Sequence, residues 1–133
     1  MPKKFPLQSS GFHPFGELIG LLFEEVGGGT SRCVLEVREK LLNPHGVVHG
    51  GALYSMADTG MGGALYSELE KDELCTTVEI KITYFKPVTE GTLTCDTKVV
   101  SRTRRIAALE SEMLCDGDLV ARASGTFYIF TAR

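Results

Sequence analysis

Residues 43–51 read NPHGVVHGG and run directly into residues 52–69, ALYSMADTGMGGALYSEL. Apolar residues recur there at intervals of three and four. This spacing predicts one long helix over about residues 50–69, with a wide apolar stripe that packs on a sheet. Three glycines, at positions 60, 62 and 63, each weaken a helix by about 1 kcal/mol, but they let neighbouring groups come close.

Alternation of apolar and polar residues with a period of two predicts strands in the rest of the chain. The sequence around Pro14 predicts a short helix within residues 12–22, and three glycines at 27–29 interrupt the chain. The order is strand, strand, helix and four strands, which predicts an α+β domain whose antiparallel sheet wraps around one helix. Asp116-Gly117 predicts a tight hairpin. Five of the six expected strands have defined bounds, namely 31–37, 77–85, 92–101, 106–115 and 119–130.

Length and composition indicate one soluble globular domain. The chain has 133 residues, of which 43% are hydrophobic and 23% charged, and its net charge is -3. We expect a single domain over residues 1–133, with a loosely ordered N-terminus of about ten residues. The acidic balance argues against a nucleic-acid partner, which favours a strongly basic field.

The cysteines indicate a reducing compartment. Cys33, Cys75, Cys95 and Cys115 are widely spaced without a C-x-x-C pair, which argues against structural zinc. All but Cys75 fall in expected strands, where a free cysteine behaves as a small apolar residue. No stretch resembles a signal core or a membrane span, so we expect a cytoplasmic protein with no membrane partner.

Gly50 opens the expected helix, where backbone N–H groups lack a partner in a preceding turn. The helix dipole adds partial positive charge there, and a residue without a side chain lets a ligand carbonyl approach closely. These properties suit an oxyanion hole. Asn43 and His49 are candidates for further donors or for positioning a water. A glycine-rich turn with a helix cap explains the same residues, so the motif alone leaves both interpretations open.

Asp58 is the only acid in residues 50–67. On a helical wheel it borders the apolar stripe, in the same sector as Tyr54 and Leu65. A carboxylate at such a border needs a partner or a function. With Gly50 upstream, we predict that Asp58 is a nucleophile or general base. The alternative is a structural aspartate that bonds a neighbouring hydroxyl or amide.

The spacing of Gly50 and Asp58 predicts an oligomer. Eight residues of helix separate them by about 12 Å along the axis, too far for both to reach one carbonyl. If they cooperate, Gly50 comes from one chain and Asp58 from another, across a two-fold axis. The smallest active unit is then a dimer.

Two other groups of residues have compositions that occur in ligand sites. His45 and His49 are four residues apart but lack the H-E-x-x-H pattern, and the neighbouring prolines and glycines argue against a helix there, so we predict no metal site. Arg102, Arg104 and Arg105 cluster between two expected strands. They are either a solvated turn or a clamp for the phosphates of a nucleotide-bearing ligand.

The pattern N-x5-H-G-G-x6-D resembles the signature of hotdog-fold acyl-CoA thioesterases of the PaaI-like, phenylacetate-pathway type. Residues 77–87, TVEIKITYFKP, are similar to that family's strand after the central helix. The resemblance covers about residues 14–130. It implies the hotdog fold and hydrolysis of acyl-CoA to a free acid and coenzyme A, with no cofactor.

The resemblance also implies roles for individual residues. The Gly50 amide would polarise the thioester carbonyl, and Asn43 and His49 would orient the carbonyl or a water. Asp58 of the partner subunit would attack the carbonyl or activate water. Thr77 matches the hydroxyl that assists the acid, and the adjacent Thr76 is the alternative.

The family is commonly a tetramer built from two dimers, so we expect a homodimer as the minimal unit and a homotetramer as the assembly. The resemblance favours the arginine cluster as a coenzyme A contact. It implies an acyl pocket lined by residues from the central helices of both subunits, namely Tyr54, Met61 and Leu65, together with N-terminal residues such as Phe15. It does not choose between an aromatic and an aliphatic acyl group.

Two other functions are compatible with the same fold. The hotdog fold also hosts hydratases and dehydratases that act on acyl thioesters, but these typically pair a catalytic histidine with the acid. A non-catalytic module that binds acyl-CoA is the other alternative, since fold alone does not determine function. Asp58 argues against the binding module, because a protein that only binds would have no use for a carboxylate near the carbonyl of an anionic ligand.

Overall fold

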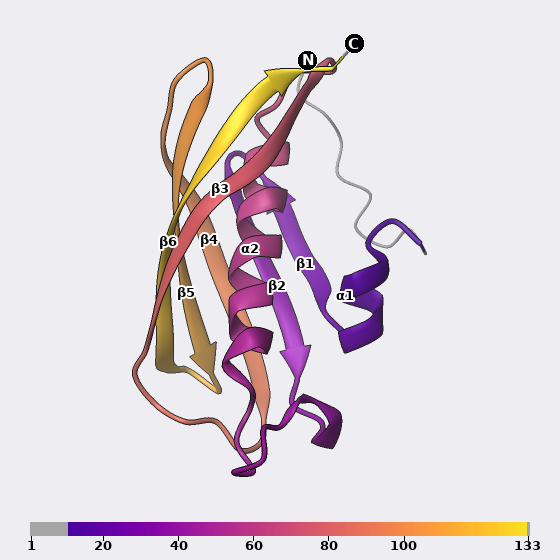
Figure 1. Ribbon diagram of the computed structural model, residues 1–133, viewed down its shortest axis with the longest axis vertical. Helices are drawn as coiled ribbons and strands as arrows, with labels where there is room; N and C mark the ends of the chain where they lie inside the picture. Colours follow the sequence, from indigo (N-terminus) through magenta and orange to yellow (C-terminus); the bar gives the residue numbers. More distant parts are fainter. Residues whose placement is uncertain (1–10, 133) are drawn as a thin grey trace.

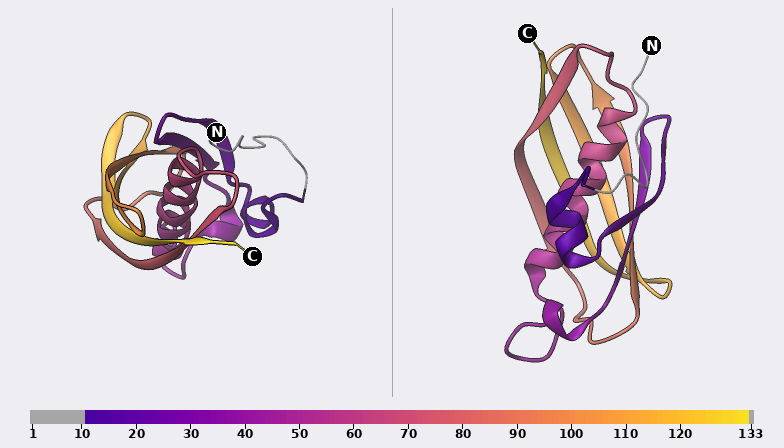
Figure 2. Two further views of the ribbon diagram at one scale, coloured as in Figure 1. Left: turned by 90° about the horizontal axis from the view of Figure 1, so that it is seen from above. Right: turned by 90° about the vertical axis from the view of Figure 1, so that its right-hand side faces the viewer.

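The computed structural model describes residues 11–132. Six strands form one antiparallel sheet in the spatial order β1-β2-β4-β5-β6-β3, which curves around helix α2 (Figures 1 and 2). This confirms the predicted α+β architecture. The expected loose N-terminus, about residues 1–10, lies outside the described residues. The elements are α1 Pro14–Ile19, β1 Leu22–Gly27, β2 Thr30–Glu36, a 3-10 turn Glu39–Leu41, α2 Gly50–Tyr66, β3 Glu73–Tyr84, β4 Thr92–Arg102, β5 Ile106–Cys115 and β6 Asp118–Thr131.

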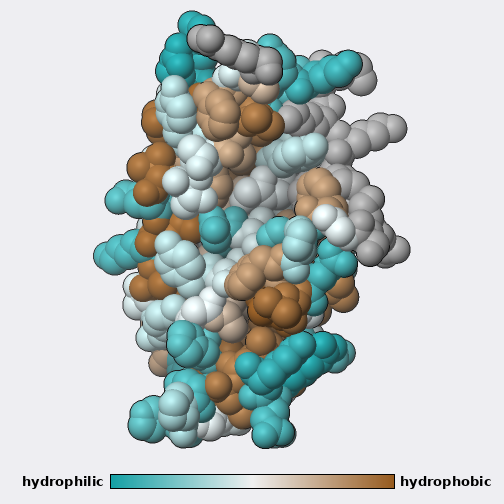
Figure 3. Space-filling model, turned by 45° about the vertical axis from the view of Figure 1, so that its right-hand side comes forward, coloured by the Kyte–Doolittle hydropathy of each residue, from teal (hydrophilic) through white to brown (hydrophobic). Residues whose placement is uncertain are grey.

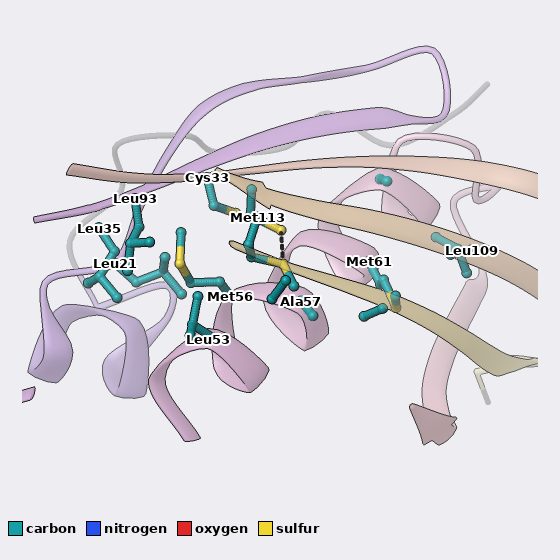
Figure 4. Packing of buried hydrophobic residues seen from close by; sticks show 14 of the residues in the cluster. Leu21, Cys33, Leu35, Leu53, Met56, Ala57, Met61, Leu93, Leu109 and Met113 are labelled. Carbon is teal, nitrogen blue, oxygen red and sulfur yellow. Dashed lines mark hydrogen bonds between the residues drawn. The ribbon is translucent and has the colours of Figure 1, made fainter. Parts of the chain in front are cut away.

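The hydrophobic core lies between α2 and the concave face of the sheet. The apolar stripe of α2 supplies Met56, Ala57, Met61 and Leu65, each fully buried. Figure 4 shows α2 side chains directed toward residues of the sheet such as Met113. Burying a Leu or Met side chain contributes about 1.5–3 kcal/mol. The spacing that predicted the helix therefore also fixes which of its faces meets the sheet.

Glycines let α2 lie close to the sheet, as the sequence suggested. A Cβ built on Gly60 would lie 2.8 Å from the Thr97 hydroxyl oxygen. The Ser31 hydroxyl donates to the Gly60 carbonyl at 2.7 Å, and the Thr97 and Ser111 hydroxyls bond each other at 2.7 Å. These hydroxyls are buried beneath the middle of the helix, so hydrogen bonds as well as packing stabilise the close contact between α2 and the sheet.

The Asp116-Gly117 hairpin is confirmed. It joins β5 to β6 with positive φ angles of 49° at Asp116 and 93° at Gly117. Two residues with positive φ match the twist of antiparallel strands, and Asp and Gly adopt this conformation at low cost.

The two helices end earlier than the sequence suggested. Helix α1 stops at Ile19 because Gly20 takes φ 81° and its N–H bonds back to the helix, so that Leu22 already begins β1. Helix α2 stops at Tyr66 rather than near residue 69. The Ser67 side chain intervenes, since its hydroxyl donates to the Ala64 carbonyl and accepts from the Gly29 N–H. Such local bonds compete with continuation of a helix.

Strand β3 begins at Glu73, four residues before the expected start. Its first residue pairs with Thr131 of β6, so the long partner strand extends it. Cys75, which the sequence placed outside the strands, therefore lies within β3. Among the described residues, no helix combines the length and apolar character needed to cross a bilayer.

Candidate active site

Asn43 orders the loop that leads into α2. Its Oδ1 atom accepts hydrogen bonds from the His45 N–H at 2.8 Å and the Val47 N–H at 3.3 Å. Its own N–H donates to the Val47 carbonyl at 2.7 Å, and Gly46 turns the chain with φ 81°. The Asn43 side chain thus holds the loop in shape through its oxygen, the Asx-turn behaviour that favours asparagine in such positions.

His49 caps the first turn of α2. Its Nδ1 atom accepts from the Gly51 N–H at 2.7 Å, and its backbone N–H donates to the Leu41 carbonyl at 2.8 Å. Because Nδ1 accepts, the ring hydrogen of neutral His49 sits on Nε2. The exposed ring therefore presents an N–H donor to the surroundings while it stabilises the helix start.

Gly50 is the first residue of α2, and its N–H has no hydrogen-bond partner among the described residues. The N–H lies at the positive end of the helix dipole. The Gly50 carbonyl accepts from the Tyr84 hydroxyl at 2.7 Å. A Cβ at this position would lie 3.0 Å from that hydroxyl oxygen. The amide that the sequence suggested as an oxyanion donor thus has no partner in the part of the chain that the structure describes, and the Tyr84 hydroxyl holds the carbonyl of the same residue.

Asp58 lies two turns further along α2 and is half-buried. Its Oδ1 atom accepts a hydrogen bond from the Thr77 hydroxyl of β3 at 2.7 Å. The structure therefore brings Thr77, rather than the adjacent Thr76, to the carboxylate. The bond orients Asp58 and leaves its second oxygen without a bond to the described residues. A carboxylate held in this way suits the role of a general base or nucleophile.

A β-bulge at Val78 brings Thr77 to the helix. The pairing of β3 with β6 shifts register between Thr77 and Glu79. Strict alternation would place Thr77 on the opposite face from Ile80 and Tyr84, but the extra residue puts all three on the side of α2. Val78, which the alternation grouped with Ile80, is instead 60% exposed.

The predicted acyl-pocket residues are not brought together. Met61 and Leu65 are fully buried in the core of their own chain. Tyr54 is 37% exposed on α2, and Phe15 is exposed on α1. Sequence spacing placed Leu65 in the sector of Asp58, but the curved sheet covers that side of the helix as well.

The three arginines lie away from Gly50, at the C-terminal end of α2. Arg102 donates to both carboxylate oxygens of Glu73 at 3.1 Å and to the Glu68 carbonyl at 3.0 Å. Arg105 donates to the Tyr128 hydroxyl at 3.3 Å, and Arg104 is exposed. The charge of Arg102 is therefore compensated within the chain, and Arg104 and Arg105 remain the more accessible cations of the cluster.

A hollow that the sequence did not reveal lies beside Gly50. Its volume is about 380 Å³, and its walls are mainly apolar but include one cation, Lys86. Sequence spacing gave no sign of it, because the hollow forms where a loop, the first turn of α2 and the segment after β3 meet. It is lined by Val47, Val48, Gly50, Leu53, Tyr84, Phe85, Lys86, Pro87 and Val88.

Comparison with known proteins identifies the family. The profile of the thioesterase superfamily matches residues 45–121, which include the loop from His45 onward, α2 with Asp58, and Thr77. The chain belongs to the thioesterase superfamily. Its fold is therefore the predicted hotdog fold, and its chemistry is thioester hydrolysis.

Individual relatives agree with this assignment. A protein of Saccharolobus solfataricus that bears the provisional name of an esterase is 33% identical over 113 residues, covering 84% of this thioesterase and 75% of the relative. A conserved protein of Pseudomonas aeruginosa superimposes with a TM-score of 0.85 at 35% identity, covering 93% and 96% of the two chains. A mutant of the phenylacetic acid degradation protein PaaI from Thermus thermophilus superimposes with a TM-score of 0.81 at 29% identity, covering 87% of this chain and 98% of that one. The PaaI-like resemblance is thereby confirmed.

Proposed function

We propose that this thioesterase hydrolyses acyl-CoA to a free acid and coenzyme A at a site shared between two subunits. The Gly50 N–H polarises the thioester carbonyl, and His49 and Asn43 shape the helix start around it. Asp58 of the partner subunit attacks the carbonyl or removes a proton from water, and Thr77 orients that carboxylate. Two observations in one chain carry the proposal: the Gly50 N–H has no partner among the described residues, and the Thr77 hydroxyl holds the Asp58 carboxylate.

The position of β3 supports the shared site. Gly50 and Asp58 belong to one helix and are separated by about 12 Å, so one chain does not offer both to one carbonyl. Strand β3 ends the described sheet and pairs there with β6 on one side. An open edge of twelve residues is a template for pairing with a second copy.

Exposed apolar side chains along the β3 edge also support pairing with a second copy of the chain. Leu74, Val78, Tyr84 and Phe85 are all exposed in the single chain. Hydrophobic surface also interrupts the hydrophilic surface on the side of the molecule that carries α1 and α2 (Figure 3). Antiparallel pairing of two β3 edges would set the two α2 helices side by side, since β3 is bonded to α2 at both Asp58 and Gly50.

The hollow beside Gly50 supports an uncharged, apolar acyl group. Its walls are supplied largely by Val47, Val48, Leu53 and Val88. A carboxylate at the far end of an acyl chain would lose its hydration against these apolar side chains, and Lys86 is the one cation in the lining. Lys86 is exposed and also lines the hollow, so it is available to an anionic part of the ligand.

The central test is release of free thiol from a panel of acyl-CoAs, with Asp58→Asn as the key variant. Asparagine keeps an oxygen that accepts from Thr77, so the fold is expected to persist. We expect turnover to fall at least about 100-fold, while binding of a non-hydrolysable acyl-CoA analogue is retained. Unchanged turnover would contradict the role of Asp58.

The same panel separates the alternatives. Tight binding without hydrolysis of any member would favour a binding module. Hydration of an unsaturated acyl chain without thiol release would favour a hydratase. Hydrolysis of neutral acyl-CoAs in preference to dicarboxylic ones is the outcome that the apolar hollow predicts.

Subunit mixing tests the shared site directly. Asp58→Asn chains and Gly50→Pro chains are each expected to be inactive alone, because proline removes the amide hydrogen of Gly50. Random mixing after dissociation makes half of the dimers hybrid, and each hybrid has one intact site. We therefore expect recovery of about a quarter of wild-type activity. No recovery from two folded variants that exchange subunits would rule out a site built from both chains.

A further inference from the structure

Tyr84 and Gly50 fit each other at the start of α2. The Tyr84 hydroxyl donates to the Gly50 carbonyl at 2.7 Å. A Cβ on Gly50 would lie 3.0 Å from the Tyr84 hydroxyl oxygen and 3.1 Å from Cζ, closer than side chains normally approach. The tyrosine therefore takes the space that a glycine leaves, and its hydroxyl ties that glycine to the end of β3.

The bond is one of two that join β3 to the functional residues of α2. Thr77 bonds Asp58, and Tyr84 bonds Gly50, both at 2.7 Å. The bulge at Val78 makes the pair of bonds geometrically compatible, because residues 77 and 84 would otherwise face opposite sides of the strand. One strand thus fixes both the carboxylate and the candidate oxyanion donor of its chain.

We propose that Tyr84 is a positioning residue of this thioesterase: it holds the Gly50 residue in place and so aims the Gly50 N–H at the thioester carbonyl. The proposal rests on the proposed function of Gly50. Tyr84 acts through Gly50 and not on the reacting atoms, since its hydroxyl hydrogen is committed to the Gly50 carbonyl. Catalytic donors need such support because small misplacements of the geometry are costly.

The protonation state of Tyr84 agrees with this role. Burial of part of the ring and then the neighbouring Tyr54 raise the pKa of Tyr84. The hydroxyl accordingly keeps its hydrogen at neutral pH and remains a donor. The ring also lines the apolar hollow beside Gly50, so the same residue contributes a wall next to the site.

Steady-state kinetics test the proposal with Tyr84→Phe. This variant keeps the ring and removes the bond to Gly50. We expect kcat to fall about tenfold with KM little changed, because the Gly50 N–H loses its orientation while substrate binding is retained. Tyr66→Phe is the matched control, because it removes a tyrosine hydroxyl at the opposite end of α2. Its kcat is expected to equal the wild-type value. Wild-type kcat in Tyr84→Phe would overturn the proposal.

A measurement independent of activity distinguishes this proposal from the proposed function. In a ¹³C- and ¹⁵N-labelled protein, loss of the bond is expected to shift the carbonyl signal of Gly50 and to speed amide exchange in the first turn of α2. Tyr66→Phe is expected to change neither. A Gly50 signal that is unchanged in Tyr84→Phe would overturn the positioning role even in an active enzyme. If the wild type hydrolyses no acyl-CoA but the Gly50 signal shifts in Tyr84→Phe, the catalytic role of Gly50 is overturned while the contact between Tyr84 and Gly50 is supported.

A double variant tests whether the two residues act as one unit. Gly50→Ala keeps the N–H but pushes a Cβ against the tyrosine, so its loss of activity comes from displaced geometry. In Tyr84→Phe the untethered ring can move by the few tenths of an ångström that the Cβ requires. The Gly50→Ala substitution should then reduce kcat less in this background than in wild type. Effects that multiply independently would overturn the assignment of Tyr84 to Gly50.

Discussion

Thr77 on β3 donates its hydroxyl hydrogen to the Oδ1 atom of Asp58 on α2, across 2.7 Å. The bond orients the only acid of the central helix. It also joins the strand that ends the described sheet to the helix that carries the site. Any pairing of β3 with a second chain would therefore act directly on the position of Asp58.

Thr77→Val is expected to lower turnover by at least about tenfold, since a hydrogen bond to a charged group contributes about 1.5–3 kcal/mol. Valine keeps the branched shape and removes the hydroxyl. Thr76→Val changes the neighbouring exposed position and serves as the control, with turnover expected to be unchanged. Thiol-release kinetics of the two variants decide the matter, and an equal effect at both positions would contradict the role of the Thr77 bond.

His49→Ala is expected to destabilise the fold by about 1 kcal/mol, because the Gly51 N–H loses the acceptor that caps α2. The measurement is the free energy of unfolding in urea. His45→Ala is the matched control. His45 is exposed, and it bonds Asn43 Oδ1 through its backbone N–H, which alanine retains. Equal stability of the two variants would show that the imidazole does not cap the helix.

Gly60→Ala and Gly62→Ala form a second matched pair within α2. A Cβ on Gly60 would meet the buried Thr97 hydroxyl oxygen at 2.8 Å, whereas a Cβ on Gly62 has nothing within 4 Å. We expect Gly60→Ala to destabilise the protein by about 1–3 kcal/mol through overpacking. Gly62→Ala should be neutral or stabilising by up to about 1 kcal/mol, through higher helix propensity. Thermal unfolding of both variants gives the comparison, and the reverse order would refute the close approach at Gly60.

Stability should decline in alkaline solution because of buried thiols. Burial raises the pKa of Cys95 from 9.0 to about 11, and burial also raises the pKa of Cys33, its partner across β2 and β4. An unfolded thiol ionises near its ordinary pKa while the folded one stays neutral, so the folded state binds more protons in this window. The contribution of Cys95 is therefore fully present below about pH 9 and is lost as the pH rises towards about 11.

The alkaline effect of Cys95 is expected to amount to about 3 kcal/mol, the equivalent of two pKa units. Urea unfolding at about pH 8 and about pH 10.5 measures about 2 kcal/mol of this effect, because the full loss develops only above about pH 11. Cys95→Ser removes the titrating group but keeps a side chain that can bond Thr97, so its stability should depend less steeply on pH than that of wild type. Identical slopes would show that this thiol does not control alkaline stability.

Much of this structure was predictable from patterns that arise within single elements. Apolar residues recur at helical spacing within residues 52–65 because one face of α2 must be buried. Asp116-Gly117 suits a two-residue hairpin because both residues tolerate positive φ. The candidate site was visible for the same reason. A glycine at a helix start and a lone acid eight residues later are local features, and the fixed rise of the helix separates them by about 12 Å.

Other features depended on contacts between distant segments. The family resemblance implied that Met61 and Leu65 line an acyl pocket. Both are fully buried in their own chain, because the curvature of the sheet decides how much of α2 it covers. Arg102 stands in a basic cluster, yet Glu73 of another strand neutralises it. The role of Tyr84 has no local signal, since its hydroxyl meets a carbonyl thirty-four residues away.

The order of elements, the buried stripe of α2 and the distance between Gly50 and Asp58 follow from the chain alone, because helical and strand periods are properties of the backbone. The side of the sheet on which each β3 residue lies does not follow from the chain alone. A single extra residue at Val78 reverses the alternation, and pairing with β6 selects where that residue goes. That bulge brings Thr77 to Asp58 and Tyr84 to Gly50, so the alignment of the site arises from long-range strand pairing and from no pattern within β3.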